Sequence, residues 1–152
     1  MTKPLLWRPE LELGVDMMDR HHHHMVTLCE TIRERVNERA KHKDAADVFS
    51  QLVGFTAMHF EAEEDLMRRS AYPGRMDHQD RHHELSLRLK SWDERARRRD
   101  CPLSSSFVAR LEMWVQNHIL GSDRGFSRFL LNSNDGALTK RECVRSVSVC
   151  FV

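Results

Sequence analysis

The chain has 152 residues and a mass of 17.9 kDa, which is the length of a single domain with one core. Hydrophobic residues make up 40% of it and charged residues 31%, a composition that excludes wholesale disorder. The 24 Lys and Arg nearly balance the 23 Asp and Glu, so we expect neither nucleic acid nor an anionic membrane as a partner.

Four segments show the three- and four-residue spacing of helices with one buried face. They run over residues 18–36, 45–66 and 78–96, and the last begins at Phe107. Their inward positions are Met18, His22, Met25, Cys29, Ile32, Val36; Ala45, Phe49, Leu52, Thr56, His59, Glu63, Leu66; His78, His82, Leu85, Leu89, Trp92, Ala96; and Phe107, Leu111, Trp114, His118.

Residues between the segments predict where these helices begin and end. Asp16 or Asp19 is expected to cap the first helix, and Tyr72-Pro73-Gly74 separates the second from the third. The basic run over 95–99 suits the end of the third helix, where cations favour the helix dipole, better than a nucleic-acid patch. Cys101-Pro102 is a predicted opening of the fourth helix, with the serines of 104–106 as competing caps.

Short connections make successive helices antiparallel neighbours, so the predicted fold is all-α, an up-down-up-down four-helix bundle with a short N-terminal arm. We expect this domain to cover residues 1–131. The helical pattern then stops, and residues 132–152 form a C-terminal tail. The tail is interpreted as a mobile extension, a strand against the bundle or a peptide that binds a protein partner.

Neither a signal peptide nor a run of 18 apolar residues is found in the sequence. The cysteines Cys29, Cys101, Cys143 and Cys150 lack the close pairs of a zinc site and the density of a disulfide framework. We therefore expect a cytoplasmic protein without a membrane partner, and we expect it to be a monomer.

Polar residues occupy inward positions where a simple bundle would have Leu or Ile. A single buried histidine is usually only a hydrogen-bonded core residue, but six such side chains converge here from four helices. Left unpaired, each would cost a few kcal/mol of desolvation, whereas a metal would take their lone pairs as ligands. These six are His22, His59, Glu63, His78, His82 and His118.

Spacing within each helix also suits a metal site. His59 with Glu63, and His78 with His82, are pairs four residues apart, which project from one helix face. Asp123 follows His118 by five residues, roughly 140° farther round an α-helix. We therefore expect Asp123 to reach the site only from its edge.

The run of four consecutive histidines contributes one inward residue by helical phase. His22 lies four residues after Met18 and seven before Cys29, so it shares their face. The remaining histidines are interpreted as surface residues or as outer neighbours of the site: His21, His23, His24, His42 and His83.

Four ordered motifs make the chain resemble the bacterial hemerythrins over about residues 5–131. The motifs are LGVDMMDRHH, HFEAEEDLM, YPGRMDHQDRHHEL and WVQNHILGSD, which carry His22; His59 and Glu63; His78 and His82; and His118 and Asp123. The resemblance implies a non-haem di-iron centre, with two iron ions and an oxo or hydroxo bridge, that takes up O2 reversibly.

The resemblance also implies a role for each of these residues. His78, His82 and His118 would bind one iron, His22 and His59 the other, and Glu63 and Asp123 would bridge both. In octahedral geometry these ligands and the bridging oxygen leave one position open, on the iron with two histidines. Phe60, Trp114, Val115 and Ile119 would line the O2 pocket, with Val115 where family members commonly carry Leu.

An imidazole-rich ligand set favours binding of O2 over oxidation chemistry, so we expect an oxygen-binding protein for storage, delivery or buffering, and not an enzyme. Two alternatives remain open. One is a sensor of oxygen or redox state that signals to a protein partner, for which the C-terminal tail is the candidate output element. The other is an enzyme that scavenges peroxide or nitric oxide at the same site.

Overall fold

Helices account for almost all of the described chain. A computed structural model describes residues 7–38, 41–100 and 103–133, and no strand occurs in these ranges. Helix α1 spans Asp16–Asn37, α2 spans His42–Arg69, and α3 spans Arg75–Arg97. The fourth segment runs without a break through three elements, which are α4 (Ser105–His118), the π-helix η2 (Ile119–Asp123) and α5 (Arg124–Asn132). A short 3-10 helix, η1 (Pro9–Leu11), precedes α1.

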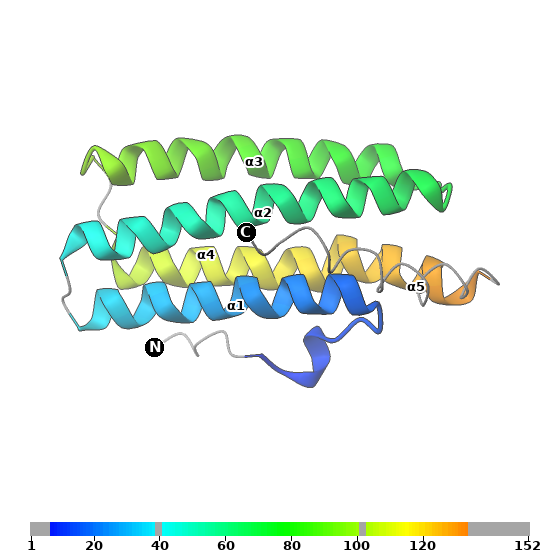
Figure 1. Cartoon of the computed structure of the whole chain (residues 1–152), viewed down its shortest axis with the longest axis horizontal. Helices are drawn as coiled ribbons and strands as arrows, with labels where there is room; N and C mark the ends of the chain where they lie inside the picture. Colours follow the sequence, from blue (N-terminus) through cyan, green and yellow to red (C-terminus); the bar gives the residue numbers. More distant parts are fainter. Residues whose placement is uncertain (1–6, 39–40, 101–102, 134–152) are drawn as a thin grey trace, which may run out of the picture.

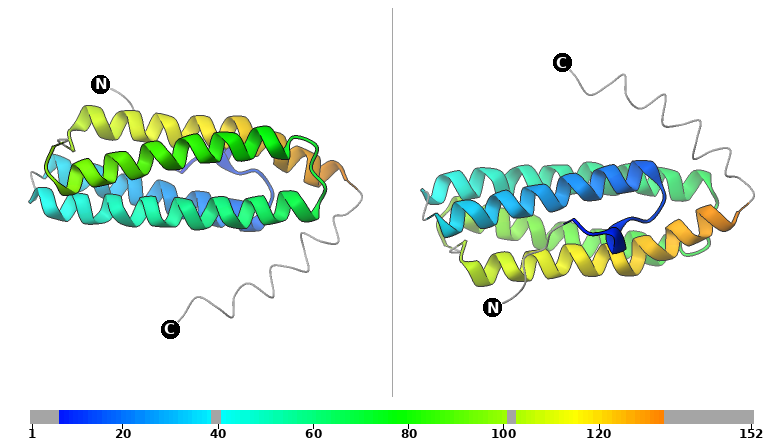
Figure 2. Two further views of the ribbon diagram at one scale, coloured as in Figure 1. Left: turned by 90° about the horizontal axis from the view of Figure 1, so that it is seen from above. Right: turned by 90° about the horizontal axis from the view of Figure 1, so that it is seen from below.

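The four helical segments lie side by side and alternate in direction (Figure 1). Helix α1 packs against α2 and α4, and α2 packs against α3, as the two further views show (Figure 2). The structure therefore confirms the predicted all-α, up-down-up-down bundle. Residues 134–152 of the predicted tail over 132–152, and the predicted opening at Cys101-Pro102, lie outside the described residues.

An N-terminal arm lies along the outside of the bundle and contacts two of its helices. The Trp7 ring packs on His23 of α1 with centroids 5.0 Å apart, and Arg124 of α5 donates a hydrogen bond to the carbonyl of Glu10. Leu11, Leu13 and Val15 bury their side chains in the core. The arm thereby joins the two helical segments between which it passes.

Helix starts differ in part from the sequence prediction. Val15 occupies the N-cap of α1 without a side-chain hydrogen bond, so neither predicted aspartate caps this helix. Asp19 instead accepts hydrogen bonds from the backbone N–H groups of Leu13 (2.7 Å) and Gly14 (2.9 Å), which fixes the arm to the helix. For α4 the predicted serine is correct, because Ser104 accepts from the N–H of Phe107.

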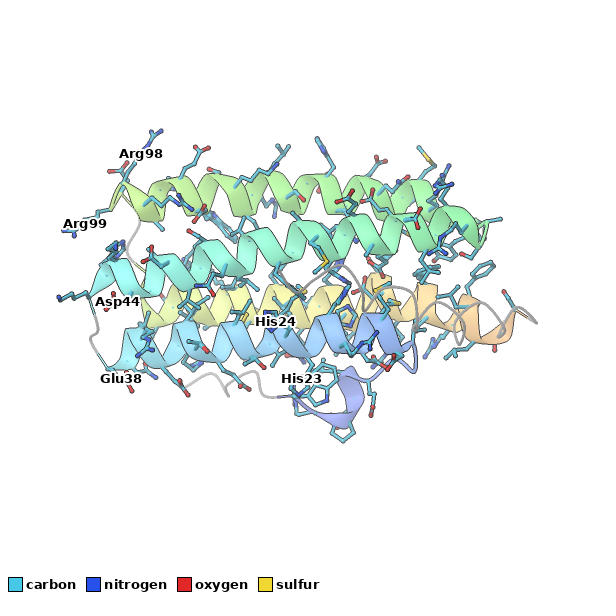
Figure 3. The ribbon with its side chains drawn as sticks, in the orientation of Figure 1. His23, His24, Glu38, Asp44, Arg98 and Arg99 are labelled. Carbon is cyan, nitrogen blue, oxygen red and sulfur yellow. The ribbon has the colours of Figure 1, made fainter. Side chains whose placement is uncertain are left out.

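Both turns that follow α2 and α3 use a non-glycine residue in the left-handed region. Ala71 has φ 51° and Arg99 has φ 61°, and each sits in a turn closed by a hydrogen bond across six residues. One such bond joins the N–H of Tyr72 to the carbonyl of Met67. This turn brings the end of α2 beside the start of α3, where the cluster of polar side chains lies. Arg98 and Arg99 project into solvent at the opposite end of α3 (Figure 3).

Candidate metal centre

A histidine–carboxylate pair of α2, His59 with Glu63, faces a pair of histidines of α3, His78 with His82. Glu63 Oε2 lies 3.2 Å from His82 Nε2, 3.6 Å from His78 Nε2 and 3.8 Å from His59 Nε2. All four side chains are buried, as expected for positions four residues apart on the inward face of each helix. The two pairs therefore converge on one point in the core.

Asp123 lies at the centre of the cluster, and the expectation that it would approach from the edge is wrong. One of its oxygens, Oδ1, lies 3.1 Å from Nε2 of both His78 and His118, while Oδ2 lies 2.9 Å from His22 Nε2. The reason is η2, because hydrogen bonds of a π-helix join residues five apart and so bring position 123 under position 118. A Cβ at Gly121 would contact nothing within 4 Å, so space does not require glycine in this turn.

All seven side chains that the sequence predicted as ligands come together in two adjoining groups. In each group the candidate ligand atoms lie within 4.8 Å of one another. The two groups share Asp123, and every residue in them is buried. The larger group is Glu63, His78, His82, His118 and Asp123, and the smaller group is His22, His59 and Asp123.

Many polar atoms of the cluster have no hydrogen-bond partner among the described residues. These atoms include both oxygens of Glu63, the Nε2 atoms of His59, His82 and His118, and Oδ2 of Asp123. Each would cost about 1–3 kcal/mol if left unpaired in the core. Imidazole nitrogens and carboxylate oxygens are metal ligands, and a bound cation would use these lone pairs. The donor set therefore fits a metal centre.

The electrostatics of the site favour the neutral form of His59, His82 and His118, which is the form that binds a metal. Burial lowers the pKa of His82 to about 2 and that of His118 to about 4, and it lowers the pKa of His59 well below its ordinary value. Burial, reinforced by the charge of Asp123, raises the pKa of the Glu63 carboxyl. Burial alone would also raise the pKa of Asp123, but the adjacent histidines, His118 foremost, hold it well below the usual range.

The apolar residues expected to line a pocket lie next to the cluster. Phe60 stacks on the His82 ring with centroids 3.8 Å apart, and its ring is 5.3 Å from that of His118. Val115 and Ile119 are fully buried. Trp114 is only partly buried; its ring is parallel to His118 at 6.0 Å, and it lines a surface hollow of about 220 Å³. His118 lines the same hollow, so the hollow reaches the edge of the cluster beside Trp114.

Within the histidine run, only His22 is buried. His21 is half-buried, and His23 and His24 are exposed. His21 nevertheless contacts the cluster, since its Nδ1 lies 3.4 Å from Nδ1 of His59. His23 contacts the N-terminal arm, and His24 packs against Phe55 (Figure 3). The helical phase of the sequence thus distinguishes the residue that enters the cluster from its neighbours.

One residue at the cluster escaped the sequence analysis. Glu64 accepts a hydrogen bond from His82 Nδ1 at 2.9 Å and a second from Gln79 Nε2 at 3.2 Å. It directly follows Glu63, so it points about 100° away from the inward face of α2. A charged residue at such a position is expected to be solvent-exposed, and only the three-dimensional structure shows that His82 of α3 is its partner.

The helical bundle and the imidazoles and carboxylates that converge in its core place this chain in the class of metal-binding four-helix bundle proteins. Comparison with known proteins identifies the family. The profile described as "Hemerythrin HHE cation binding domain" matches residues 13–130. The chain therefore belongs to the hemerythrin family.

Individual relatives are similar over most of their length. The chain is 26% identical to a bacteriohemerythrin of Stenotrophomonas maltophilia over 124 residues, which is 81% of this chain and 79% of the relative. It is 30% identical to the myohemerythrin of Riftia pachyptila over 123 residues, 81% of this chain and 91% of the relative.

In the described ranges, no helix is long and apolar enough to cross a membrane.

Proposed function

We propose that this protein binds O2 reversibly at a non-haem di-iron centre and serves in oxygen storage, delivery or buffering. The observation that carries the proposal is the pair of adjoining ligand groups that share Asp123. A single metal would leave one group without a partner, whereas two metals would use both. Membership in the hemerythrin family supports iron as the metal.

We assign the histidines to the two irons by group. His78, His82 and His118 would bind one iron, and His22 and His59 the other, as the grouping suggests. Asp123 would bridge the irons, since it belongs to both groups. Glu63 would be the second bridge, because one of its oxygens approaches histidines from both groups.

The seven ligand residues would hold two ferrous ions, which would supply the electrons for reversible binding of O2. The chain itself supplies a shielded site. Phe60 packs on the His82 ring, Val115 and Ile119 are fully buried, and these apolar side chains keep water and protons from the centre. Because burial keeps His59, His82 and His118 neutral and the cluster has no exposed acid group, the site favours binding over proton-coupled turnover.

Iron content and oxygen uptake of matched variants test the proposal. Wild-type protein should hold two irons per chain and take up one O2 per pair. His22→Ala should lose iron and uptake, whereas His23→Ala, which removes an exposed neighbour on the same helix, should keep both. Equal iron loss in the two variants would contradict the assignment of His22. Rapid consumption of peroxide or nitric oxide by wild-type protein, without reversible uptake of O2, would instead support the scavenging enzyme.

A further inference from the structure

The outer nitrogen of one cluster histidine meets a carboxylate that lies outside the cluster. His82 Nδ1 is 2.9 Å from Glu64 Oε1, and its other nitrogen, Nε2, faces Glu63 Oε2 at 3.2 Å. Because an ionised carboxylate only accepts hydrogen bonds, the hydrogen of the neutral ring lies on Nδ1. The lone pair of Nε2 is then directed into the cluster.

The remaining contacts of His82 and Glu64 keep this arrangement rigid. Phe60 stacks on the His82 ring at an interplanar angle of 9°, which blocks its rotation. Gln79, on the same helix as His82, donates a hydrogen bond to the second oxygen of Glu64. Glu64 belongs to α2, so it is held between two groups of α3 and is itself fixed in position.

Three other histidines of the cluster, His22, His59 and His78, differ from His82 at their outer nitrogens. Nδ1 of His22 and Nδ1 of His78 are buried and have no hydrogen-bond partner among the described residues. Nδ1 of His59 lies 3.4 Å from Nδ1 of another imidazole, that of His21, and not beside a carboxylate. An anionic outer partner is thus seen at His82, on the side of the cluster with three histidines.

We propose that Glu64 is a positioning residue for the metal centre, which holds His82 with Nε2 toward the metal and places a negative charge behind this ligand. The inference rests on the proposed function only in that a metal occupies the larger group. Carboxylates behind ligating histidines fix the tautomer and raise the basicity of the ligand, and their loss typically lowers metal affinity about 10-fold to 100-fold. Glu64 should accordingly make the metal of His82 bind more tightly and resist reduction.

Variants at Glu64 and one matched control test this role with Co2+ as the probe. Glu64→Ala removes the acceptor, Glu64→Gln keeps an acceptor oxygen without the charge, and Glu61→Gln removes an equal charge from an exposed site on the same helix. We expect Glu64→Ala to lower Co2+ affinity by about 10-fold to 100-fold. Glu64→Gln should lose less, and Glu61→Gln should match wild type.

Nitrogen NMR of the metal-free proteins gives a readout that a purely structural role would not move. His82 should be the Nδ1–H tautomer in wild type and in Glu64→Gln, and it should lose that preference in Glu64→Ala. The inference is overturned if Glu64→Ala keeps both the tautomer and an affinity within twofold of wild type. Helical circular dichroism checks that each variant is folded.

These measurements separate the inference from the proposed function. Co2+ binding and the His82 tautomer involve neither iron nor O2. A wild-type protein that binds Co2+ tightly but takes up no O2 would contradict the proposed function, while the comparison of Glu64 variants would still decide the role of Glu64.

Discussion

Replacing Glu63 with Leu should stabilise the metal-free protein while abolishing its metal centre. Glu63 is fully buried, neither of its oxygens has a hydrogen-bond partner among the described residues, and burial raises its pKa. Leu has a similar volume, so the substitution leaves no cavity. It removes an unsatisfied carboxyl, which destabilises the folded state by about 1–3 kcal/mol, and it adds buried apolar surface. A gain of about 2 kcal/mol corresponds to a Tm increase of about 4–8 °C for a chain of this length.

Thermal unfolding of metal-free and metal-loaded protein, side by side, measures this effect. In the metal-loaded samples the order should reverse, because a bound metal stabilises wild type and Glu63→Leu lacks a bridging ligand. Glu61→Leu makes the same change at an exposed position and should alter stability by about 0.5 kcal/mol at most. A metal-free Tm for Glu63→Leu several degrees below wild type would refute the reasoning, since it would show that the carboxyl is already well paired.

Three further predictions concern other parts of the molecule. In the folded state the pKa values of His82 and His118 are about 2 and about 4, whereas in the unfolded chain these histidines titrate near pH 6.5. The free energy of unfolding of the metal-free protein should therefore decrease as the pH falls from about 7 to 5. Urea denaturation across this pH range measures the effect. The raised pKa of Glu63 opposes this trend, and a flat profile would mean that it cancels the histidines. Val115→Leu should slow the decay of the oxygenated protein and Val115→Ala should accelerate it in stopped flow, because the shorter wall admits more water; equal rates would exclude Val115 from this role. Ser104→Ala should cost about 1 kcal/mol by chemical denaturation, since it removes the cap of α4, and an unchanged midpoint would mean that Ser106 substitutes for it.

The hydrophobic periodicity of the sequence predicted most of the fold, because each helix buries one stripe of residues with a regular spacing. Most of the residues at these positions are buried, from Met18 on α1 to Leu111 on α4, whereas four of them are only partly buried: Val36, Leu85, Trp92 and Trp114. Helix ends were harder to predict. The left-handed residues at Ala71 and Arg99 are not glycines, so composition gave no signal, and Asp19 turned out to bind the arm instead of capping α1.

Polar residues on the inward stripes indicated the cluster, but its geometry depends on two features that spacing conceals. A five-residue separation from His118 places Asp123 off the face of an α-helix, and only the π-helix η2 brings it to the centre. Glu64 lies off the inward stripe of α2 and accepts a hydrogen bond from His82 of α3. The first feature is a local departure from α-helical geometry and the second is a contact between two helices, and the spacing of an ideal α-helix reveals neither.

The most direct test of the central claim follows the absorption spectrum of the iron-loaded, reduced protein through repeated cycles of air and degassing. The account predicts oxo-bridged di-iron charge-transfer bands that appear with O2, disappear on degassing and return at equal intensity, with the iron content unchanged. Bands that appear once and persist after degassing would show irreversible oxidation, and they would contradict reversible O2 binding by this protein.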